Sequence, residues 1–371
     1  MSAKHITVLV SNDLEFDQRV KKTCDTLLHM GFRITLVGRF LPTSKPFERP
    51  YEIKRFKLPF HSGVGFYLCL QVALFFYLWR KKTDVILAND LDTLVPAYLV
   101  SKWRKKGLVY DSHELFTEAE GLTGHEIKRG IWLRLEKWIL PKLSKMYTVN
   151  KTIAAIFQKQ YGIPVGVVRN IALLETELPE SNRRQLNLPE DKCIVLLQGS
   201  YIDPDRGGEE AVLSMKHLNW AHLLIIGSGR AVPSLRALVK KEGLHDRVTV
   251  LDKMPFQKLR EYTACADFGL SLDKPLHLNY TYSLPNKVFD YIHCGVPIIV
   301  SDLPELRRLV EEHEVGVIVK EMTPEGLAQT ISLAFHSEDK IRWKENCLKT
   351  RLTLSWQNES KVIESYFEEY L

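Results

Sequence analysis

The polar side chains with the clearest chemical meaning gather at the predicted start of a helix in residues 282–302, YSLPNKVFDYIHCGVPIIVSD. Ser283 can cap the free N–H groups of that helix, and Asn286 and Lys287 follow in its first turn. Free N–H groups, the positive end of the helix dipole and a lysine together favour a bound phosphate. Asp290, one turn further on, can accept hydrogen bonds from a ribose diol. The same spacing also suits an ordinary capped helix with a solvated lysine and aspartate.

A second candidate for phosphate binding follows the predicted strand at residues 193–198. Gly199 and Gly227 each follow a predicted strand and permit close approach of a ligand to the backbone, although such a glycine is weak evidence by itself. Arg206 precedes a predicted helix, and a guanidinium group can hold a phosphate through two hydrogen bonds. The second half of the chain therefore contains both an arginine and a lysine that are suited to phosphate.

Three polar loops follow predicted strands in the first half of the chain, at residues 12–17, 89–92 and 111–114. In open parallel sheets, ligands bind beyond the carboxyl ends of the strands, where these loops are expected. His113 can bond a sugar hydroxyl or shuttle a proton, but it could equally be a structural histidine. The candidate residues in the three loops are Asn12, Asp13, Asp17, Asp90, His113 and Glu114.

The alternation of strands and helices predicts an α/β protein with doubly wound parallel sheets that are covered by helices. No GxGxxG follows the first strand, so a dinucleotide fingerprint is absent from that position. A length of 371 residues favours two domains. The acidic, proline-bearing segment at residues 171–191 is the predicted linker, because the strand–helix pattern restarts after it.

The composition, 45% hydrophobic and 26% charged, is that of a soluble globular protein. Residues 1–170 contain 27 Lys and Arg against 15 Asp and Glu, a net charge of +12, whereas the remainder contains 24 against 30, a net charge of −6. The two halves are therefore expected to meet different partners. Six scattered cysteines without a CxxC, and no histidine pair at zinc spacing, predict neither a metal site nor disulfides. The N-terminal MSAKHITVLV runs into a strand and is not a signal peptide, so a reducing cytoplasm is expected.

Two segments of the first half resemble membrane-binding helices in composition. Residues 64–79 are nearly all apolar and are followed by three cations at 80–82. This segment is shorter than the roughly 20 residues of a spanning helix, so we expect a buried helix, with an interfacial helix as the alternative. Residues 125–146 are amphipathic, basic and tryptophan-bearing, which suits a membrane-surface helix or a helix on its own sheet with cations in solvent. The basic first half predicts reversible, salt-sensitive attachment to an anionic membrane.

The region at residues 282–302 resembles the C-terminal-domain signature of GT-B glycosyltransferases of family 4, the glycosyl transferases group 1. Residues 294–297, Cys-Gly-Val-Pro, match the end of the Ala-Met-Ala-x-Gly-x-Pro run in that signature. Asp290 stands at the second of two glutamates that frame the region in many members, whereas Tyr282 stands at the first and departs from the pattern. The EFDQRV and YDSHELF runs resemble N-terminal-domain motifs of the same branch.

The resemblance implies two Rossmann-like domains that face a cleft. An acceptor-side domain at residues 1–170 and a linker at 171–191 would precede a nucleotide-sugar domain at 192–345. The C-terminal helices at 346–371 would pack back on the first domain.

The resemblance also implies roles for the candidate residues. Arg206 and Lys287 would grip the pyrophosphate of the nucleotide sugar and His113 would contact the transferred sugar, so these three are the predicted catalytic residues. Asp290 would hold the ribose. Much of the family has an arginine after the first glycine and a lysine a few residues later, but here Ser200 replaces the arginine and Arg206 stands at the lysine position. Further nucleotide-sugar contacts are expected from Gly199, Ser200, Gly227, Ser283 and Asn286, and acceptor-side contacts from Asn12, Asp13, Asp17, Asp90 and Glu114.

The expected activity is that of a hexosyltransferase (EC 2.4) that moves a sugar from a UDP- or GDP-type nucleotide sugar to a glycan or lipid-linked acceptor. Family members are typically retaining and need no metal, so no cofactor is expected, and the pathway would make cell-surface polysaccharide or glycolipid. The expected location is the cytoplasm or, reversibly, the anionic inner face of the plasma membrane, without a nucleic-acid partner. Two alternatives stay open: a nucleotide-sugar 2-epimerase of the same fold, and a non-catalytic sugar- or partner-binding module, which the loss of a glutamate at Tyr282 allows.

Overall fold

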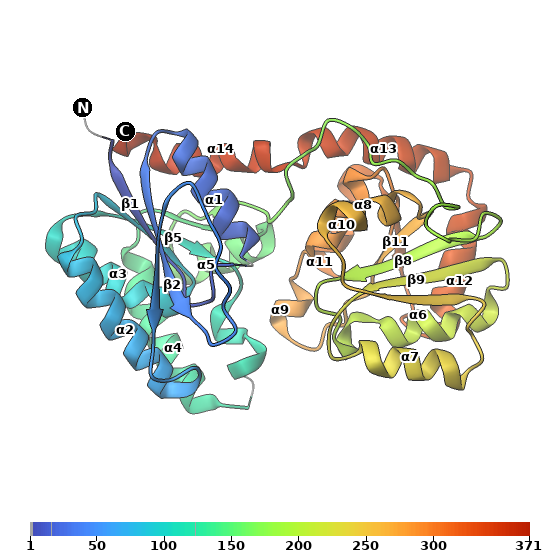
Figure 1. Cartoon of the computed structure of the whole chain (residues 1–371), viewed down its shortest axis with the longest axis horizontal. Coiled ribbons are helices and arrows are strands. Elements are labelled where there is room, and N and C mark those ends of the chain that lie inside the picture. The colour runs from blue at the N-terminus through green and yellow to red at the C-terminus, as the bar shows by residue number, and fades with distance from the viewer. Residues whose placement is uncertain (1–2, 16, 123) are drawn as a thin grey trace. The chain divides into compact units, whose positions relative to one another are not determined.

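The computed structural model describes residues 3–15, 17–122 and 124–371, which fold into two compact units. The first unit contains Met1–Asn170 with Trp356–Leu371, and the second contains Ile171–Ser355. Each unit is a parallel sheet with helices packed against it (Figure 1). The predicted α/β class with two doubly wound parallel sheets is therefore confirmed.

The first unit is built on a seven-stranded sheet in the order β3-β2-β1-β4-β5-β6-β7. Its strands pair in parallel. The central strands β1 and β4 are buried along their whole length, as expected where helices cover both faces of a sheet. The strands are β1 (His5–Leu9), β2 (Arg33–Phe40), β3 (Glu52–Lys57), β4 (Val85–Asn89), β5 (Gly107–Ser112), β6 (Met146–Thr148) and β7 (Gly166–Val167).

The helices of the first unit pack in two groups. Helices α2 and α3 lie side by side in Figure 1, and α1 contacts the C-terminal helix α14. Helix α1 begins after Asp17, whose carboxylate accepts a hydrogen bond from the N–H of Val20 and so caps the helix. The helices are α1 (Gln18–His29), α2 (Gly63–Arg80), α3 (Leu91–Arg104), α4 (Glu126–Ile139), α5 (Lys151–Tyr161) and α14 (Trp356–Phe367).

The sheet register brings the predicted polar loops of the first unit to one edge. Leu9 at the end of β1 pairs with Ala88 of β4, and Asn89 pairs with Asp111 of β5. Because these strands are parallel, the loops that follow them all leave the sheet on the same side.

The second unit is built on a six-stranded sheet in the order β10-β9-β8-β11-β12-β13, again with parallel pairing. The strands are β8 (Cys193–Gly199), β9 (Ala221–Gly227), β10 (Val248–Asp252), β11 (Phe268–Ser271), β12 (Ile298–Ser301) and β13 (Gly316–Val319). The helices are α6 (Gly208–Ser214), α7 (Val232–Lys241), α8 (Phe256–Ala264), α9 (Leu278–Thr281), α10 (Asn286–His293), α11 (Pro304–His313), α12 (Pro324–His336) and α13 (Asp339–Thr353).

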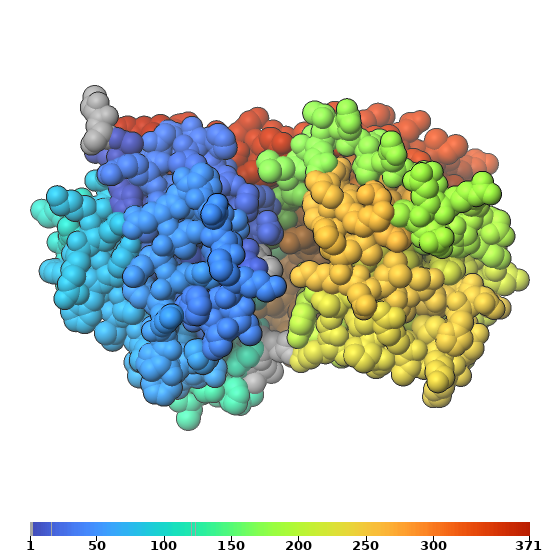
Figure 2. Space-filling model, viewed as in Figure 1, coloured from blue at the N-terminus to red at the C-terminus, as the bar shows by residue number. Residues whose placement is uncertain are grey.

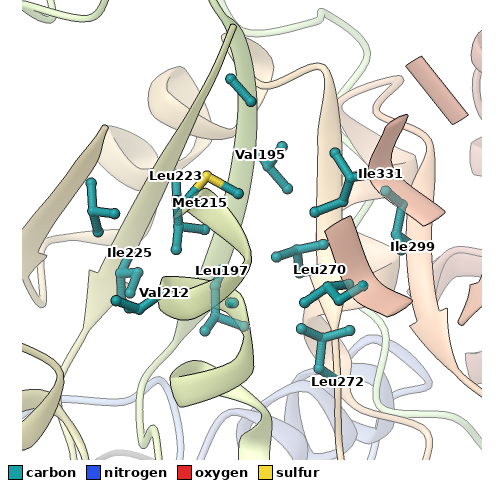
Figure 3. Close-up of a cluster of buried hydrophobic side chains, with 14 of the residues drawn as sticks. Val195, Leu197, Val212, Met215, Leu223, Ile225, Leu270, Leu272, Ile299 and Ile331 are labelled. Atoms are coloured by element: carbon teal, nitrogen blue, oxygen red, sulfur yellow. The ribbon is translucent and has the colours of Figure 1, made fainter. Parts of the chain in front are cut away.

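One core of the second unit lies between its sheet and helices α6 and α12 (Figure 3). Leu197 of β8 and Leu270 of β11 project into it, together with Val212 of α6 and Ile331 of α12. All four side chains are fully buried. This packing fixes the carboxyl ends of β8 and β11, where the candidate phosphate-binding residues follow.

The boundaries between the units differ from those predicted. Residues 171–191, the predicted linker, belong to the second unit, because Ile171, Leu186 and Leu188 are buried in its core. Helix α13 also stays in the second unit, where Cys347 is buried, so the chain returns to the first unit after residue 355 and not at 346. Trp356 anchors α14 there, since its indole N–H donates to the hydroxyl of Thr26 at 3.1 Å. Three buried apolar side chains attach this segment to the second unit, although most of its other residues stay exposed or half-buried.

Helix α2 is not the buried helix that its apolar sequence predicts. It covers the sheet with one face, where Leu70, Leu74 and Leu78 are fully buried. Its other face is exposed, and Val64 and Leu68 each keep 61% of their surface accessible. The correction has a simple cause, since an apolar composition does not reveal how many faces of a helix the fold covers.

Candidate active site

The centre of the candidate site in the second unit is Asp273, a fully buried aspartate that follows β11. Its Oδ1 lies 2.5 Å from Nη1 of Arg206, and its Oδ2 lies 4.0 Å from Nζ of Lys287. Ser271 donates a hydrogen bond from Oγ to Oδ2 of Asp273 at 3.2 Å. Two cations from separate elements thus converge on one buried carboxylate.

The backbone that carries Arg206 is held tightly against the end of β11. Arg206 ends a short 3-10 turn (Pro204–Arg206), and Gly207 follows with φ of 70°. A Cβ atom on Gly207 would lie 2.3 Å from Cβ of Leu272, so only glycine allows this close approach. The guanidinium also lies over the ring of Tyr280, 4.5 Å from its centroid. The local fold therefore fixes the arginine before any ligand arrives.

Lys287 lies in the first turn of α10, where N–H groups and the helix dipole add positive potential. Burial lowers the pKa of Lys287, and Asp273 acts against that effect. Burial disfavours the charge of Asp273 as well, but Lys287 and Arg206 outweigh it and hold the pKa of Asp273 below its usual value. One carboxylate therefore faces two cations in a desolvated place, where a second anion would stabilise both cations.

Asp290 lies one turn further along α10 and faces the end of β8. Gln198 donates from Nε2 to Oδ2 of Asp290 at 3.4 Å, and the hydroxyl of Thr263 donates to Oε1 of Gln198 at 2.8 Å. The backbone N–H of Gln198 donates to the hydroxyl of Tyr291 at 3.1 Å. This network orients the Asp290 carboxylate at the carboxyl end of the sheet.

In the first unit, His113 lies between two aspartates. Its Nδ1 is 3.3 Å from Oδ2 of Asp90, and its Nε2 is 3.3 Å from Oδ2 of Asp111. Nε2 also lies 3.2 Å from Oδ1 of Asn89, and the backbone N–H of His113 donates to Asp90 at 2.9 Å. Burial opposes the charge on the imidazole, but Asp90 and Asp111 outweigh it and raise the pKa of His113 to about 9. At neutral pH this histidine is therefore protonated, a donor and not a base.

Asp111 is itself held by a buried arginine. Arg19 donates from Nε and Nη2 to the two carboxylate oxygens of Asp111 at 2.9 and 2.7 Å, and from Nη1 to the carbonyl of Val168 at 2.7 Å. Only 4% of the Arg19 side chain is exposed. This bidentate pair ties α1 to β5 and fixes the position of His113.

The fold is shared with solved structures over nearly the whole chain. Sucrose-phosphate synthase from Thermosynechococcus elongatus superposes with a TM-score of 0.79 at 18% identity, and 99% of each chain is covered. Anabaena HepE, in complex with UDP and glucose, gives a TM-score of 0.73 at 14% identity, also with 99% of each chain covered. Residues 18–171 match the family model of glycosyltransferase family 4, and residues 206–336 match that of glycosyl transferases group 1. The chain belongs to the GT-B glycosyltransferases.

A curated relative of this glycosyltransferase is the chitobiosyldiphosphodolichol beta-mannosyltransferase of Candida albicans, which is 24% identical over 238 residues. The match covers 55% of this chain and 51% of the relative, so the chain spans about half the length of the curated relative that it matches.

The predicted residues of the second unit lie near one another at the carboxyl end of its sheet, but the predicted capping role of Ser283 is wrong. Gly199 and Gly227 are neighbours in the sheet, and a Cβ on Gly227 would lie 1.9 Å from the carbonyl oxygen of Gly199. The Ser200 carbonyl accepts a hydrogen bond from Ser228 at 2.7 Å, and Asn286 opens α10. Ser283 does not cap that helix, because its hydroxyl donates to the carbonyl of Tyr280 at 2.9 Å and residue 285 occupies the cap position.

The predicted residues of the first unit separate into two groups. Asp90 joins His113, as described, and burial together with Asp90 raises the pKa of Glu114 to about 7. Asn12 donates to Asp17 at 2.8 Å, and Asp17 caps α1, so these two stabilise their own loop. Asp13 accepts a hydrogen bond from Ser44 and lies 3.5 Å from Arg55, which commits it to the segment around β2 and β3.

The sequence analysis did not name three of these residues as candidates: Asp273 in the second unit, and Asp111 and Arg19 in the first. A signal existed for Asp273, because a charged residue directly after a buried strand marks the ligand-binding edge of a parallel sheet. The same signal applied to Asp111, at the end of β5. Arg19 lies in the EFDQRV run that resembles an N-terminal-domain motif, but the run alone did not single it out, since a single arginine in an amphipathic helix is normally solvated. Among the described residues, no group of three or more His, Cys, Asp or Glu is arranged to hold a metal ion.

Proposed function

We propose that this glycosyltransferase is an active hexosyltransferase that uses a UDP- or GDP-type sugar as donor and a glycan or lipid-linked molecule as acceptor. The observation that carries the proposal is the convergence of Arg206 and Lys287 on the buried carboxylate of Asp273. Two cations that share one counterion, beside a helix N-terminus, suit a diphosphate.

The same cations would act during transfer. When the bond between the sugar and the diphosphate breaks, negative charge grows on the departing phosphate oxygens. Arg206 and Lys287 are held in place beforehand by Asp273, so they can stabilise this charge without reorganising. Asp290, oriented by Gln198, would accept hydrogen bonds from the ribose hydroxyls of the donor.

The residues of the first unit would act on hydroxyl groups. His113 carries protons on both ring nitrogens at neutral pH, so it would not remove a proton; it would share one of the N–H groups that now face Asp90 and Asp111 with a hydroxyl of the transferred sugar. Asp90 and Glu114 would contact acceptor hydroxyls. The non-catalytic alternative is disfavoured by the combination of a preorganised cation pair and an oriented histidine, which binding alone would not require.

The acceptor, the stereochemistry and the location belong to the same proposal. The relative's name denotes a beta-mannosyl transfer to a lipid diphosphate, which supports a lipid-linked glycan as acceptor. We propose a retaining, metal-free reaction on the cytoplasmic side of a membrane, in the synthesis of polysaccharide or glycolipid. Activity should therefore survive EDTA, and NMR of the product should show the anomeric configuration of the donor. Loss in EDTA with recovery in magnesium or manganese would contradict the first expectation, and an inverted anomer the second.

A donor panel tests the central proposal. UDP-, GDP- and dTDP-sugars are compared by thermal shift, and the donor that stabilises the protein is then incubated with and without lipid-linked oligosaccharide. We expect transfer that needs the acceptor. Conversion of the donor sugar to its 2-epimer without acceptor would identify an epimerase, and stabilisation by the sugar without any reaction would identify a binding module.

A further inference from the structure

Helix α2 exposes apolar side chains that the fold does not cover. Its inner face is complete, because Leu70, Leu74 and Leu78 are fully buried in the first unit. A helix on the surface of a water-soluble unit needs one apolar face, so a second one indicates a partner. The second face recurs every four residues, each between 49% and 61% exposed, and we call it the α2 stripe: Val64, Leu68, Val72 and Phe76.

The stripe ends in a cluster of aromatic rings shared with α3. The rings of Phe75 and Trp79 stack with centroids 5.9 Å apart, and Trp103 of α3 meets Trp79 edge-on at 6.0 Å. Trp79 and Trp103 remain 46% and 60% exposed. Arg104 donates to the carbonyls of residues 78, 79 and 81 and so fastens the end of α2 to α3. In Figure 2 the segment of α2 lies open at the surface of the first unit.

Cations surround this end of the stripe. The guanidinium of Arg80 lies 5.4 Å from the ring centroid of Phe76. The neighbouring acids Glu52 and Asp84 already pair with Lys81 and Lys106. Tryptophans beside cations are typical of segments that meet the headgroups of anionic lipids. The exposed cations at the ends of α2 and α3 are Arg80, Lys82, Lys102 and Lys105.

Helix α4 extends the surface. Tyr67 of α2 packs edge-on against Trp132 of α4, with ring centroids 5.1 Å apart. On α4, Ile127 is 83% exposed and Ile131 51% exposed. Apolar side chains therefore reach solvent from two helices that contact each other, among the basic residues of the amphipathic α4.

We propose that the α2 stripe, with Trp79 and Trp103, docks the protein on an anionic lipid bilayer. Among the described helices, α2 alone is long and apolar enough to cross a membrane by length and composition. Its inner leucines are committed to the unit's core, however, so it would lie in the plane of the interface. A second copy of the chain is a poorer occupant, because it would present the same cationic surface, and the neighbouring acids Glu52 and Asp84 are already paired with Lys81 and Lys106. The docking surface does not depend on the proposed sugar transfer.

Flotation of the full chain with lipid vesicles tests this proposal. Vesicles of phosphatidylcholine alone are compared with vesicles that also contain phosphatidylglycerol, at low and high salt. We expect binding to the anionic vesicles that weakens with salt. The double variant Leu68→Asp/Phe76→Asp should lose roughly tenfold or more in binding, because charged side chains would replace the inserted ones. The control is Leu333→Asp, which makes the same leucine-to-aspartate change at a residue of the second unit that is 66% exposed. It should bind like the unchanged protein.

Each outcome decides the proposal. Circular dichroism checks that the variants fold, and Leu68→Ser/Phe76→Ser replaces the aspartates if they do not. The proposal is overturned if the unchanged protein stays in solution with anionic vesicles at low salt, or if the stripe variant floats as well as the control. The surface would instead be assigned to a second copy if sedimentation shows a dimer, if the stripe variant is monomeric, and if the unchanged protein does not bind vesicles. Donor binding, measured on the same samples, should be unaffected.

Discussion

Each unit contains a buried aspartate at the carboxyl end of its sheet, and each aspartate is bound to an arginine. Asp111 in the first unit is held by Arg19 through two hydrogen bonds, and only 4% of that arginine is exposed. Asp273 in the second unit meets Arg206 through Nη1, and 24% of this arginine is exposed. We call the Asp111–Arg19 pair closed, because its arginine is shielded from solvent, and the Asp273–Arg206 pair open, because its arginine is partly accessible. We therefore propose that a buried carboxylate can have either a structural or a binding role, and that the exposure of its arginine distinguishes the two roles.

Removing the aspartates gives the largest expected effect. Asp111→Ala and Asp273→Ala each leave buried cations without their counterion, so each should cost roughly 3–5 kcal/mol in the free energy of unfolding. Inorganic pyrophosphate should restore part of the stability of Asp273→Ala, because it can reach Arg206 and Lys287. It should not restore Asp111→Ala, whose arginine is enclosed. Denaturant unfolding with and without pyrophosphate measures both, and equal rescue of the two variants would remove the distinction between closed and open pairs.

His113→Ala should separate the roles of the two units. We expect the transfer rate to fall by roughly 10²–10³-fold, the effect of losing a preorganised donor, while nucleotide affinity barely changes. Steady-state kinetics and calorimetry with the nucleotide diphosphate give the two numbers. A collapse of nucleotide affinity together with turnover would show that the division of labour is wrong.

The raised pKa of His113, about 9 against 6.5 for an isolated histidine, predicts a pH dependence. Its protonation contributes stability that is complete below the unfolded pKa and is lost as pH rises through about 9. The transfer rate should decline as pH rises through about 9, and above that pH by roughly tenfold per pH unit, because the neutral ring has one donor fewer. The variant His113→Asn keeps a donor that does not titrate. An unchanged alkaline limb in that variant would assign the decline to another group.

Asp290→Asn should have the smallest effect. A weakened pair of hydrogen bonds to ribose is worth roughly 1 kcal/mol, or about fivefold in affinity for a ribonucleoside diphosphate. The 2′,3′-dideoxy analogue should bind the variant and the unchanged protein alike. If both nucleotides lose affinity equally in titration calorimetry, Asp290 has no part in ribose recognition.

The sequence predicted what depends on local pattern and left out what depends on packing. Strand–turn–helix alternation placed the polar loops correctly, since parallel strands send their carboxyl ends to one edge. The pairing of Arg206 with Asp273 could not be read from the chain, because the residues are far apart in sequence and meet only through the register of β8 and β11. The exposed face of α2 was missed for a related reason, as composition does not specify which faces of a helix are covered. Ser283 failed as a cap because a short helix before it uses the hydroxyl.

Calorimetric titration of the open pair tests the central claim most directly. Nucleoside diphosphate and the corresponding nucleoside are titrated into the unchanged protein, Arg206→Ala/Lys287→Ala, and the control Lys258→Ala, which removes a cation of an exposed pair on α8. Each lost charge-assisted bond is worth roughly 1.5–3 kcal/mol, so the diphosphate should bind the double variant at least about 100-fold more weakly. Nucleoside affinity and the control should stay unchanged. Equal losses for diphosphate and nucleoside, or no loss for either, would show that Arg206 and Lys287 do not bind the pyrophosphate.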